Sequence, residues 1–282
     1  MKRNKSFDNS APLLYLVATP IGNLGEMSKR ALDVLSDMDI IAAEDTRNTC
    51  SLLAQYGIKK ELFSLREHNE NEASEHLISL LKNGKKIAYV SDAGYPGISD
   101  PGYLLVKNAI EQDIAVSTVS GSCAFINALV ASGLPTDHFY FYGFLPKKGN
   151  EAKTELQKLE NREETIIFYE SPHHIKETVE LLHKVFKNRK AVIARELTKL
   201  NEEYVRGNLD DLVALDFNSL KGEMVILVEG NTNLENQITD NQISAKIAYF
   251  LALGISKKIA IQIVTDELGV GKNRVYKIAQ NM

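Results

Sequence analysis

Short apolar runs alternate with segments of helical period through residues 13–135, which is the pattern of an α/β protein. The apolar runs predict strands at 13–18, 40–43, 86–90 and 114–119. Amphipathic segments between them predict helices that begin after Ser28 and near 47, 69, 103 and 122. Asp100 and Pro101 are expected to supply the N-cap and the first-turn proline of the helix near 103.

The pattern changes after Pro135, where we therefore expect a domain boundary. An aromatic, alternating run at 139–144 opens a second series of predicted strands, which continues at 164–169, 190–196, 202–207 and 221–230. The last two are expected to run antiparallel. Ser171 and Pro172 are expected to open the helix that follows the second of these strands.

These patterns predict an α/β protein of two domains, 13–135 and 136–230, because 282 residues exceed what one core usually holds. Residues 1–12 are polar and are expected to be a disordered tail, 231–242 reads as a linker, and 243–282 as a small helical appendage. No apolar run approaches the roughly 20 residues that span a bilayer. We therefore expect a cytoplasmic protein with no membrane partner.

Charge is distributed unevenly along the chain. The net charge is −4, which argues against a protein that coats nucleic acid by electrostatics alone. From Lys246 to the end, however, the chain has six basic and two acidic residues, a net charge of +4. The rest of the chain therefore carries a net charge of −8. The basic appendage is either a contact for a polyanion or a solvated helical face.

Three loops rich in small residues follow predicted strands. The motifs GxGxxG and GxxxxGK[ST] are absent, which argues against a standard dinucleotide fold or a P-loop ATPase. In their place stand ATPIGNLGEMS (18–28), SDAGYPGISDPG (91–102) and GSCA (121–124). Glycine lets the backbone approach a ligand closely, and open α/β sheets bind ligands where their strands end. These loops predict a ligand crevice along one edge of the sheet.

Six sequence blocks resemble one known family in order and spacing. The blocks are LYLVATPIGNLGEMS, AAEDTRNT, SDAGYPGISDPG, YESPHHI, ARELTKLNEEYVRG and KGEMVILVEG. Together they resemble the ribosomal RNA cytidine 2′-O-methyltransferases, a branch of the tetrapyrrole (precorrin) methylase superfamily. The chain departs from the usual pattern at 120–124, which reads SGSCA, and at His174, where the family often has arginine.

The resemblance implies the two-domain tetrapyrrole-methylase-like fold (class III methyltransferases), in a homodimer. S-adenosylmethionine would lie in the cleft between the domains, and the substrate would be a cytidine ribose in small-subunit (16S) ribosomal RNA, on the assembled subunit. The residues that it implies for cofactor binding are Pro20, Gly22, Asp92, Gly94, Tyr95, Pro96, Ile98, Cys123, Ala124, Phe125, Tyr169, Ala194, Gly222 and Glu223. For Asp92, capping its own loop is an equally good interpretation.

Methyl transfer to a ribose hydroxyl requires alignment of the reactants and help in removing a proton. The candidate bases are Glu44, Asp45, Asp100 and Glu196, with Arg47 as a group that could bind phosphate or keep a carboxylate ionised. No cluster with metal-ligand spacing is present, and we expect no metal. Two alternatives remain open: a methyltransferase for small-molecule tetrapyrroles, and a non-catalytic ribosome-assembly factor with the same fold.

Overall fold

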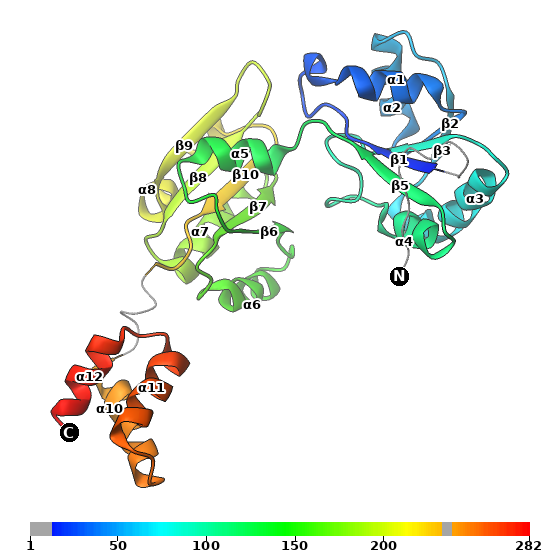
Figure 1. The fold of residues 1–282 in the computed structure, drawn as a ribbon. Coiled ribbons are helices and arrows are strands. Elements are labelled where there is room, and N and C mark those ends of the chain that lie inside the picture. Colours follow the sequence, from blue (N-terminus) through cyan, green and yellow to red (C-terminus); the bar gives the residue numbers. More distant parts are fainter. Residues whose placement is uncertain (1–12, 233–238) are drawn as a thin grey trace.

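The computed structural model describes residues 13–232 and 239–282 (Figure 1). The predicted tail, 1–12, and part of the predicted linker, 233–238, lie outside these ranges. None of the helices in the described ranges is long and apolar enough to cross a lipid bilayer.

The first domain is built on a five-stranded sheet in the order β3-β2-β4-β1-β5, with every neighbouring pair parallel. Its strands are β1 (Leu13–Val17), β2 (Ile40–Ala43), β3 (Glu61–Ser64), β4 (Ile87–Val90) and β5 (Ala115–Val119). Four of them confirm predicted strands. The fifth, β3, was missed because Glu61–Ser64 lies at the sheet edge and lacks a continuous apolar run.

Two helices cover each face of this sheet, as the two apolar clusters of the domain indicate. The helices are α1 (Lys29–Asp37), α2 (Thr46–Gln55), α3 (Glu70–Lys82) and α4 (Tyr103–Glu111). Leu35 of α1 and Leu53 of α2 pack on one face, whereas Leu77 of α3 and Leu105 of α4 pack on the other. Burial on both faces explains why β2 and β4 are apolar throughout.

The predicted cap of α4 is wrong. The N-cap is Gly102, at φ +128°, and Asp100 makes no capping hydrogen bond. The carboxylate of Glu70 caps the helix instead, since its Oε1 accepts from the amides of Gly102 (2.7 Å) and Leu104 (2.9 Å). Because Glu70 of α3 caps the helix, Asp100 is not needed as its cap. Asp100 instead lines the cleft described below.

The second domain contains a mixed sheet in the order β6-β7-β10-β8-β9. Its strands are β6 (Phe139–Phe144), β7 (Thr165–Glu170), β8 (Lys190–Arg195), β9 (Glu203–Asn208) and β10 (Met224–Val228). All five were predicted. β6 and β7 are parallel, while β9 and β10 both run antiparallel to β8, as expected for the last two strands.

Helices α6 (Gly149–Leu159), α7 (Ile175–Phe186) and α8 (Leu209–Val213) cover one face of the second sheet. The predicted start of α7 is wrong: Pro172 lies in a turn that follows Ser171, and the N-cap is His174. The hydroxyl of Thr178, on α7, donates to the Glu170 carboxylate (2.6 Å), which also accepts from the Ser171 amide. Through Glu170, these hydrogen bonds connect Ser171, before the turn, to Thr178 of α7.

Helix α5 (Ala124–Ser132) covers the opposite face of the second sheet, although it precedes Pro135 in sequence. Its Ala128 and Leu129 share an apolar cluster with Ile167 of β7 and Val225 of β10. The chain therefore passes from one core to the other before α5, near residue 121, and not at Pro135 as predicted (Figure 1). The periodicity of α5 reveals an apolar helix but not which sheet it covers.

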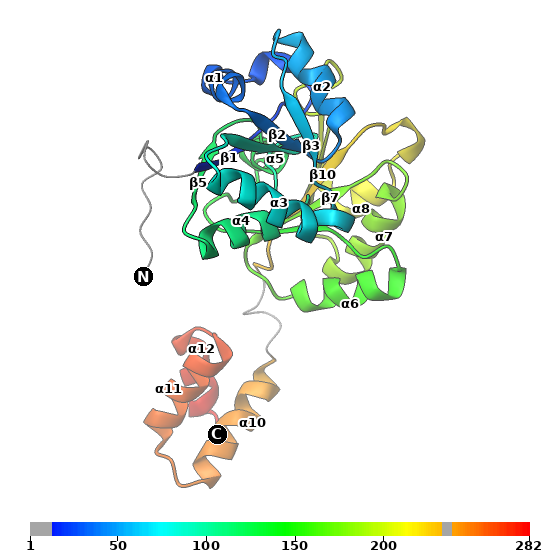
Figure 2. The same ribbon diagram turned by 90° about the vertical axis from the view of Figure 1, so that its right-hand side faces the viewer.

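Three helices follow the second domain and form a separate bundle in both views (Figures 1 and 2). They are α10 (Asp240–Ala252), α11 (Lys257–Leu268) and α12 (Lys272–Gln280). Helix α11 confirms the predicted limits, with Ser256 as its N-cap and Gly269 as its C-cap. Since α10 begins at Asp240, it includes the last residues assigned to the linker from sequence.

Candidate functional site

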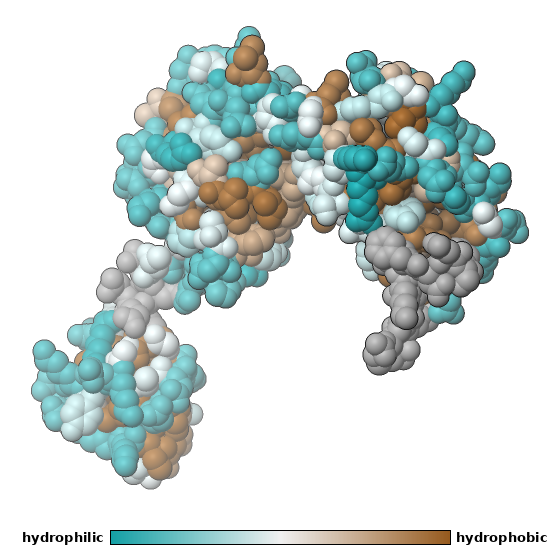
Figure 3. Space-filling view, turned by 45° about the horizontal axis from the view of Figure 1, so that its top comes forward, coloured by the Kyte–Doolittle hydropathy of each residue, from teal (hydrophilic) through white to brown (hydrophobic). Residues whose placement is uncertain are grey.

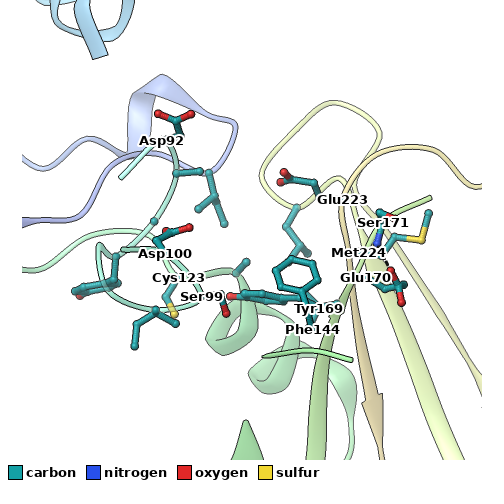
Figure 4. Close-up of a pocket in the computed structure, with 18 of the residues that line it drawn as sticks. Asp92, Ser99, Asp100, Cys123, Phe144, Tyr169, Glu170, Ser171, Glu223 and Met224 are labelled. Atoms are coloured by element: carbon teal, nitrogen blue, oxygen red, sulfur yellow. Dashed lines mark hydrogen bonds between the residues drawn. The ribbon is translucent and has the colours of Figure 1, made fainter. Parts of the chain in front are cut away.

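A cleft of about 400 Å³ lies between the two sheets, a size that suits a small-molecule ligand. Loops after β2, β4 and β5 form one wall, and the second domain forms the other (Figure 4). The crevice predicted at the carboxyl ends of the parallel strands is therefore confirmed as a cavity.

The loops of the first domain are fixed to one another by backbone contacts. Thr19 and Gly94 exchange two hydrogen bonds, of 2.9 and 3.0 Å, which join the loop after β1 to the loop after β4. The Tyr95 hydroxyl accepts from the Gly121 amide (3.2 Å), which adds the loop after β5. Gly94 itself has φ +75°, a conformation that L side chains rarely adopt. These contacts give the cleft a preformed wall of backbone.

Acidic side chains dominate the polar part of this wall. Asp100 and Glu44 line the cleft with Glu223 of the second domain, and Asp100 and Glu223 project into the space between the two sides (Figure 4). Burial, with a smaller contribution from the charge of Glu44, raises the pKa of Asp100 to about 7. Burial also raises the pKa of Glu44, and the charge of Asp92 adds to the effect. The cleft thus favours positive charge, or a proton, at this point.

Asp92 also borders the cleft, but both of its carboxylate oxygens bind the start of α2. Oδ1 accepts from the Asp45 amide (3.3 Å) and Oδ2 from the Asn48 side chain (2.7 Å). Asp92 therefore joins the loop after β4 to α2, and does not cap its own loop as the alternative interpretation expected. Its charge still acts on Glu44 and Asp100.

Asp45 and Arg47 lie outside the cleft lining. Asp45 is the N-cap of α2 and accepts from Arg47 at three nitrogens, including Nη2 at 2.6 Å. Hydrogen bonds from the Arg47 side chain and backbone hold the pKa of Asp45 well below its usual range. A carboxylate so stabilised is a weak base, which makes Asp45 a poor candidate.

The second domain contributes an aromatic wall, in which Phe144 is 57% exposed and lies 5.5 Å from the Tyr169 ring, centroid to centroid. A β-bulge sets the direction of Phe144. The register of β6 on β7 shifts between Phe141 and Gly143. As a result Tyr169 pairs with Phe144, whereas without the shift it would pair with Gly143. Without the extra residue, Phe144 would face the α6–α7 side of the sheet. The bulge therefore places a large apolar ring in the cleft.

Glu196 reaches the cleft from a tight turn after β8, where its φ is +50°. Its Oε1 pairs with Lys199 Nζ at 2.8 Å. Gly222 packs against this side chain so closely that a Cβ there would lie 1.9 Å from Oε1. At Gly22, a Cβ would lie 2.6 Å from Lys199 Cγ. Gly222 thus makes room for the Glu196 side chain, and Gly22 of the first domain makes room for Lys199, which packs across from the second domain beside the cleft.

The cleft gathers most of the residues that were predicted for it. Those that line it are Glu44, Asp92, Gly94, Tyr95, Ile98, Asp100, Cys123, Ala124, Tyr169, Glu196 and Glu223. Those that do not are Pro20, Gly22, Asp45, Arg47, Pro96, Phe125, Ala194 and Gly222. Ala194 is fully buried in β8, and Phe125 stacks on Phe141 (4.5 Å), so both contribute to the core beneath the site. Pro20 and Gly22 line a smaller adjacent hollow.

Several lining residues were not predicted from the sequence, among them Phe144, Lys199 and Met224. Lys199 and Met224 lie within the blocks ARELTK and KGEMVILVEG, which could have indicated them. Phe144 depends on the bulge, for which Gly143 in the aromatic run is the available signal. Across the described ranges, no group of three or more His, Cys, Asp or Glu side chains is arranged to hold a metal ion.

Comparisons with known proteins agree with the cleft and the fold. The sequence model of the family described as Tetrapyrrole (Corrin/Porphyrin) Methylases matches residues 13–213. Solved structures of the same architecture include a uroporphyrin-III-C-methyltransferase from Thermus thermophilus (TM-score 0.56, 19% identity, covering 80% of this chain and 98% of that one). The methyltransferase CobJ is similar (TM-score 0.58, 17% identity, 78% and 95%). At these identities the structures support the fold alone.

Full-length relatives are closer in sequence. A protein of Escherichia coli O157:H7 named "Ribosomal RNA small subunit methyltransferase I" is 43% identical over 99% of this chain and 98% of its own length. Proteins of the same name from Halalkalibacterium halodurans (42%; 99% of both chains) and Bacillus subtilis (40%; 98% and 97%) are similar. The chain therefore belongs to the tetrapyrrole methylase family, in the group of its members that carry this name.

Proposed function

We propose that this protein transfers a methyl group from S-adenosylmethionine to the ribose 2′-hydroxyl of a cytidine in small-subunit ribosomal RNA. The observation that carries the proposal is an acidic, preformed cleft between two domains of this family's fold, in a chain that matches ribosomal RNA methyltransferases along almost its whole length. The assembled subunit is the proposed substrate. Because ribosomal subunits are made and used in the cytoplasm, we propose that location for the reaction.

The charge of the cleft suits the proposed methyl donor. S-adenosylmethionine carries a positive sulfonium, and Glu44, Asp100 and Glu223 surround the cleft with acidic groups. Burial raises the pKa of Asp100 and of Glu44, so a nearby cation would stabilise their ionised forms and gain binding free energy in return. Tyr169 and Ile98 add apolar surface for the rest of the molecule. The residues present therefore fit this group.

When bound, S-adenosylmethionine supplies a methyl group already activated by its sulfonium. The protein must hold the ribose hydroxyl in line, exclude water and accept a proton. Asp100 is the best-placed base in the described residues, since its carboxylate faces the cleft and its pKa of about 7 lies near the working pH. Glu44, beside it, is the second candidate. Lys199, paired with Glu196 in the second domain, packs against Gly22 of the first domain at the edge of the cleft.

Phe144 is proposed to stack on the base of the target nucleotide, because RNA enzymes often hold splayed bases on aromatic rings. Replacing Phe144 by alanine is expected to weaken RNA-substrate binding about tenfold or more, the loss of one stacked base. The affinity for S-adenosylmethionine should change much less. Calorimetry with the cofactor and filter binding with small subunits measure the two effects separately. A loss confined to cofactor affinity would assign Phe144 to the methyl donor instead.

Methylation is expected to require no metal ion held by the protein, because the sulfonium needs no Lewis acid. Treating the enzyme with a chelator, removing the chelator and adding the enzyme to subunits at constant magnesium should leave the rate unchanged. Loss of activity that returns only when a divalent ion is given to the enzyme would contradict this expectation.

Mass-spectrometric mapping of ribosomal RNA tests the function itself. A strain that lacks the gene should lose one 2′-O-methylcytidine from the small-subunit RNA, and restoring the gene should return it. Unchanged RNA would favour the small-molecule tetrapyrrole alternative, and methylation restored by a cleft variant unable to bind S-adenosylmethionine would favour the non-catalytic assembly factor.

We propose that the protein acts as a homodimer. An exposed apolar face on α5 and β6 supports this assembly: Ile126, Val130 and Phe139 are 37%, 70% and 41% exposed. Figure 3 shows apolar side chains gathered on this domain within a more polar surround. Light scattering of the purified protein measures the mass, and Val130→Glu should shift it toward the monomer.

A further inference from the structure

The C-terminal appendage is a folded unit with its own core. Ile243 and Ile247 of α10 pack with Ile261 and Val264 of α11 and with Val275 of α12. These apolar residues are thus used within the bundle. Its surface carries polar and charged side chains together with Tyr249, Leu253 and Ile259, which are 60%, 60% and 55% exposed.

Helices α11 and α12 have the connection of a helix-turn-helix. Three residues join them: Gly269, at φ +62°, ends α11, Val270 is 2% exposed in the core, and Gly271 is the N-cap of α12. A short turn with glycine and a buried apolar residue is typical of this motif, in which the second helix is exposed for contact with nucleic acid. Helix α10 packs against both helices.

The basic residues of the unit fall into two groups. Lys246 pairs with Glu267 (2.9 Å) and Arg274 with Asp240 (2.7 Å), so these four charges compensate one another. Lys257 and Lys258, at the start of α11, and Lys272 and Lys277, on α12, are exposed and form no ion pair with any described residue. Lys272 donates only to the neutral side chain of Gln262 (3.0 Å). Both helices of the motif therefore carry uncompensated positive charge.

Helix α12 also carries hydrogen-bonding and aromatic groups. Asn273, Tyr276, Lys277 and Gln280 are exposed, and their spacing of three and four residues puts them on one side of the helix. Tyr276 is 52% exposed. An ammonium, a phenol ring and two amides on one helix face can bind phosphates and the edges of nucleotides, and can stack on an unpaired base.

We propose that the exposed side of α12, together with the start of α11, binds the phosphodiester backbone of RNA near the target nucleotide. The identity of the nucleic acid as RNA rests on the proposed function. The residues before Lys246 carry a net charge of −8, which repels a polyanion, so this face supplies attraction that the body lacks. It is a surface separate from the methyl-donor cleft.

The test uses the full-length protein with Lys257, Lys258, Lys272 and Lys277 all replaced by glutamine. A matched variant replaces four exposed lysines of the body: Lys59, Lys107, Lys153 and Lys176. The probe is small ribosomal subunits from the deletion strain, with affinity measured by filter binding over a series of KCl concentrations at fixed magnesium. For each phosphate that the variant no longer neutralises, the slope of log affinity against log salt should flatten by roughly 0.7–0.9, and for four phosphates by about 3.

We expect affinity at low salt to fall about tenfold or more in the appendage variant, with cofactor affinity and melting temperature unchanged. The body variant should keep the slope. An unchanged slope in the appendage variant, or an equal change in both variants, would overturn the proposal. A DNA duplex that competes better than RNA of equal length would also overturn it. Loss of the methylated nucleoside in the mapping experiment tests the proposed function separately, because it compares strains with and without the gene and involves no change in the appendage.

A second variant, Tyr276→Ala, keeps every charge and tests whether the ring of Tyr276 stacks on an RNA base. It should lower affinity for the subunits about tenfold while leaving the salt slope as it is, since stacking makes little use of counterions. Affinity equal to that of the unchanged protein would restrict the contact to the lysines.

Discussion

Replacing Asp100 by asparagine is expected to lower the rate constant of methylation by about 100-fold or more, the usual contribution of a general base. Asparagine preserves the shape of the side chain but cannot accept the proton. In the unchanged enzyme, kcat/KM should rise with pH and level off above the Asp100 pKa of about 7, because the carboxylate must be ionised to act. Single-turnover methylation of subunits across pH 5.5–9 measures both effects.

The same substitution is expected to stabilise the fold at neutral pH. Burial raises the pKa of Asp100 in the folded state, so between about pH 4 and pH 7 the unfolded chain releases a proton that the folded chain retains. Stability contributed by this group is therefore present below pH 4 and is lost as the pH rises through 7. Allowing for solvent in the open cleft, Asp100→Asn should raise the free energy of unfolding by ~2 kcal/mol above pH 7 and by little at pH 4.

Two further variants make the result specific. Asp33→Asn makes the same chemical change at an exposed position of α1 and should alter neither rate nor stability. Glu44→Gln tests the neighbouring carboxylate. A full loss of rate in Glu44→Gln with normal turnover in Asp100→Asn would transfer the role of base to Glu44.

Replacing Gly94 by valine is expected to weaken S-adenosylmethionine binding about 100-fold or more, while the protein stays folded. Gly94 lines the cleft, and a Cβ there would lie 3.5 Å from Ile21 Cγ2, an ordinary contact that the protein itself can accept. A branched side chain adds volume at the edge of the cleft. It also strains the backbone, since the φ of +75° costs a β-branched residue on the order of 1–3 kcal/mol.

Gly57 provides a control for the strain. Its φ is +69° and a Cβ would meet nothing within 4 Å, so Gly57→Val imposes a similar backbone cost away from the cleft. Calorimetry should find normal cofactor affinity in this variant, with a melting temperature lowered about as much as in Gly94→Val. Normal affinity in a folded Gly94→Val would show that the methyl donor does not bind against this loop.

The parts of the fold that the sequence predicted are those that local pattern decides. Strands β2 and β6 have the predicted limits, and Ser28 caps α1 as expected, because buried apolar runs and caps depend on neighbours in the chain. The loop at 91–102 was found for the same reason, since its glycines mark positions of unusual φ. That loop contains five of the predicted residues that line the cleft, namely Asp92, Gly94, Tyr95, Ile98 and Asp100.

The sequence by itself thus determined the α/β class, nine of the ten strands that the structure describes and the small-residue loops of the site. Tertiary structure decided what depends on distant partners. It assigned α5 to the second sheet through Ile167 and Val225, gave the cap of α4 to Glu70, and bound Asp92 to α2. It also turned Phe144 into the cleft by a one-residue bulge and buried Asp100 beside Glu44. Burial and proximity between remote segments fix these roles, and local periodicity carries no information about either.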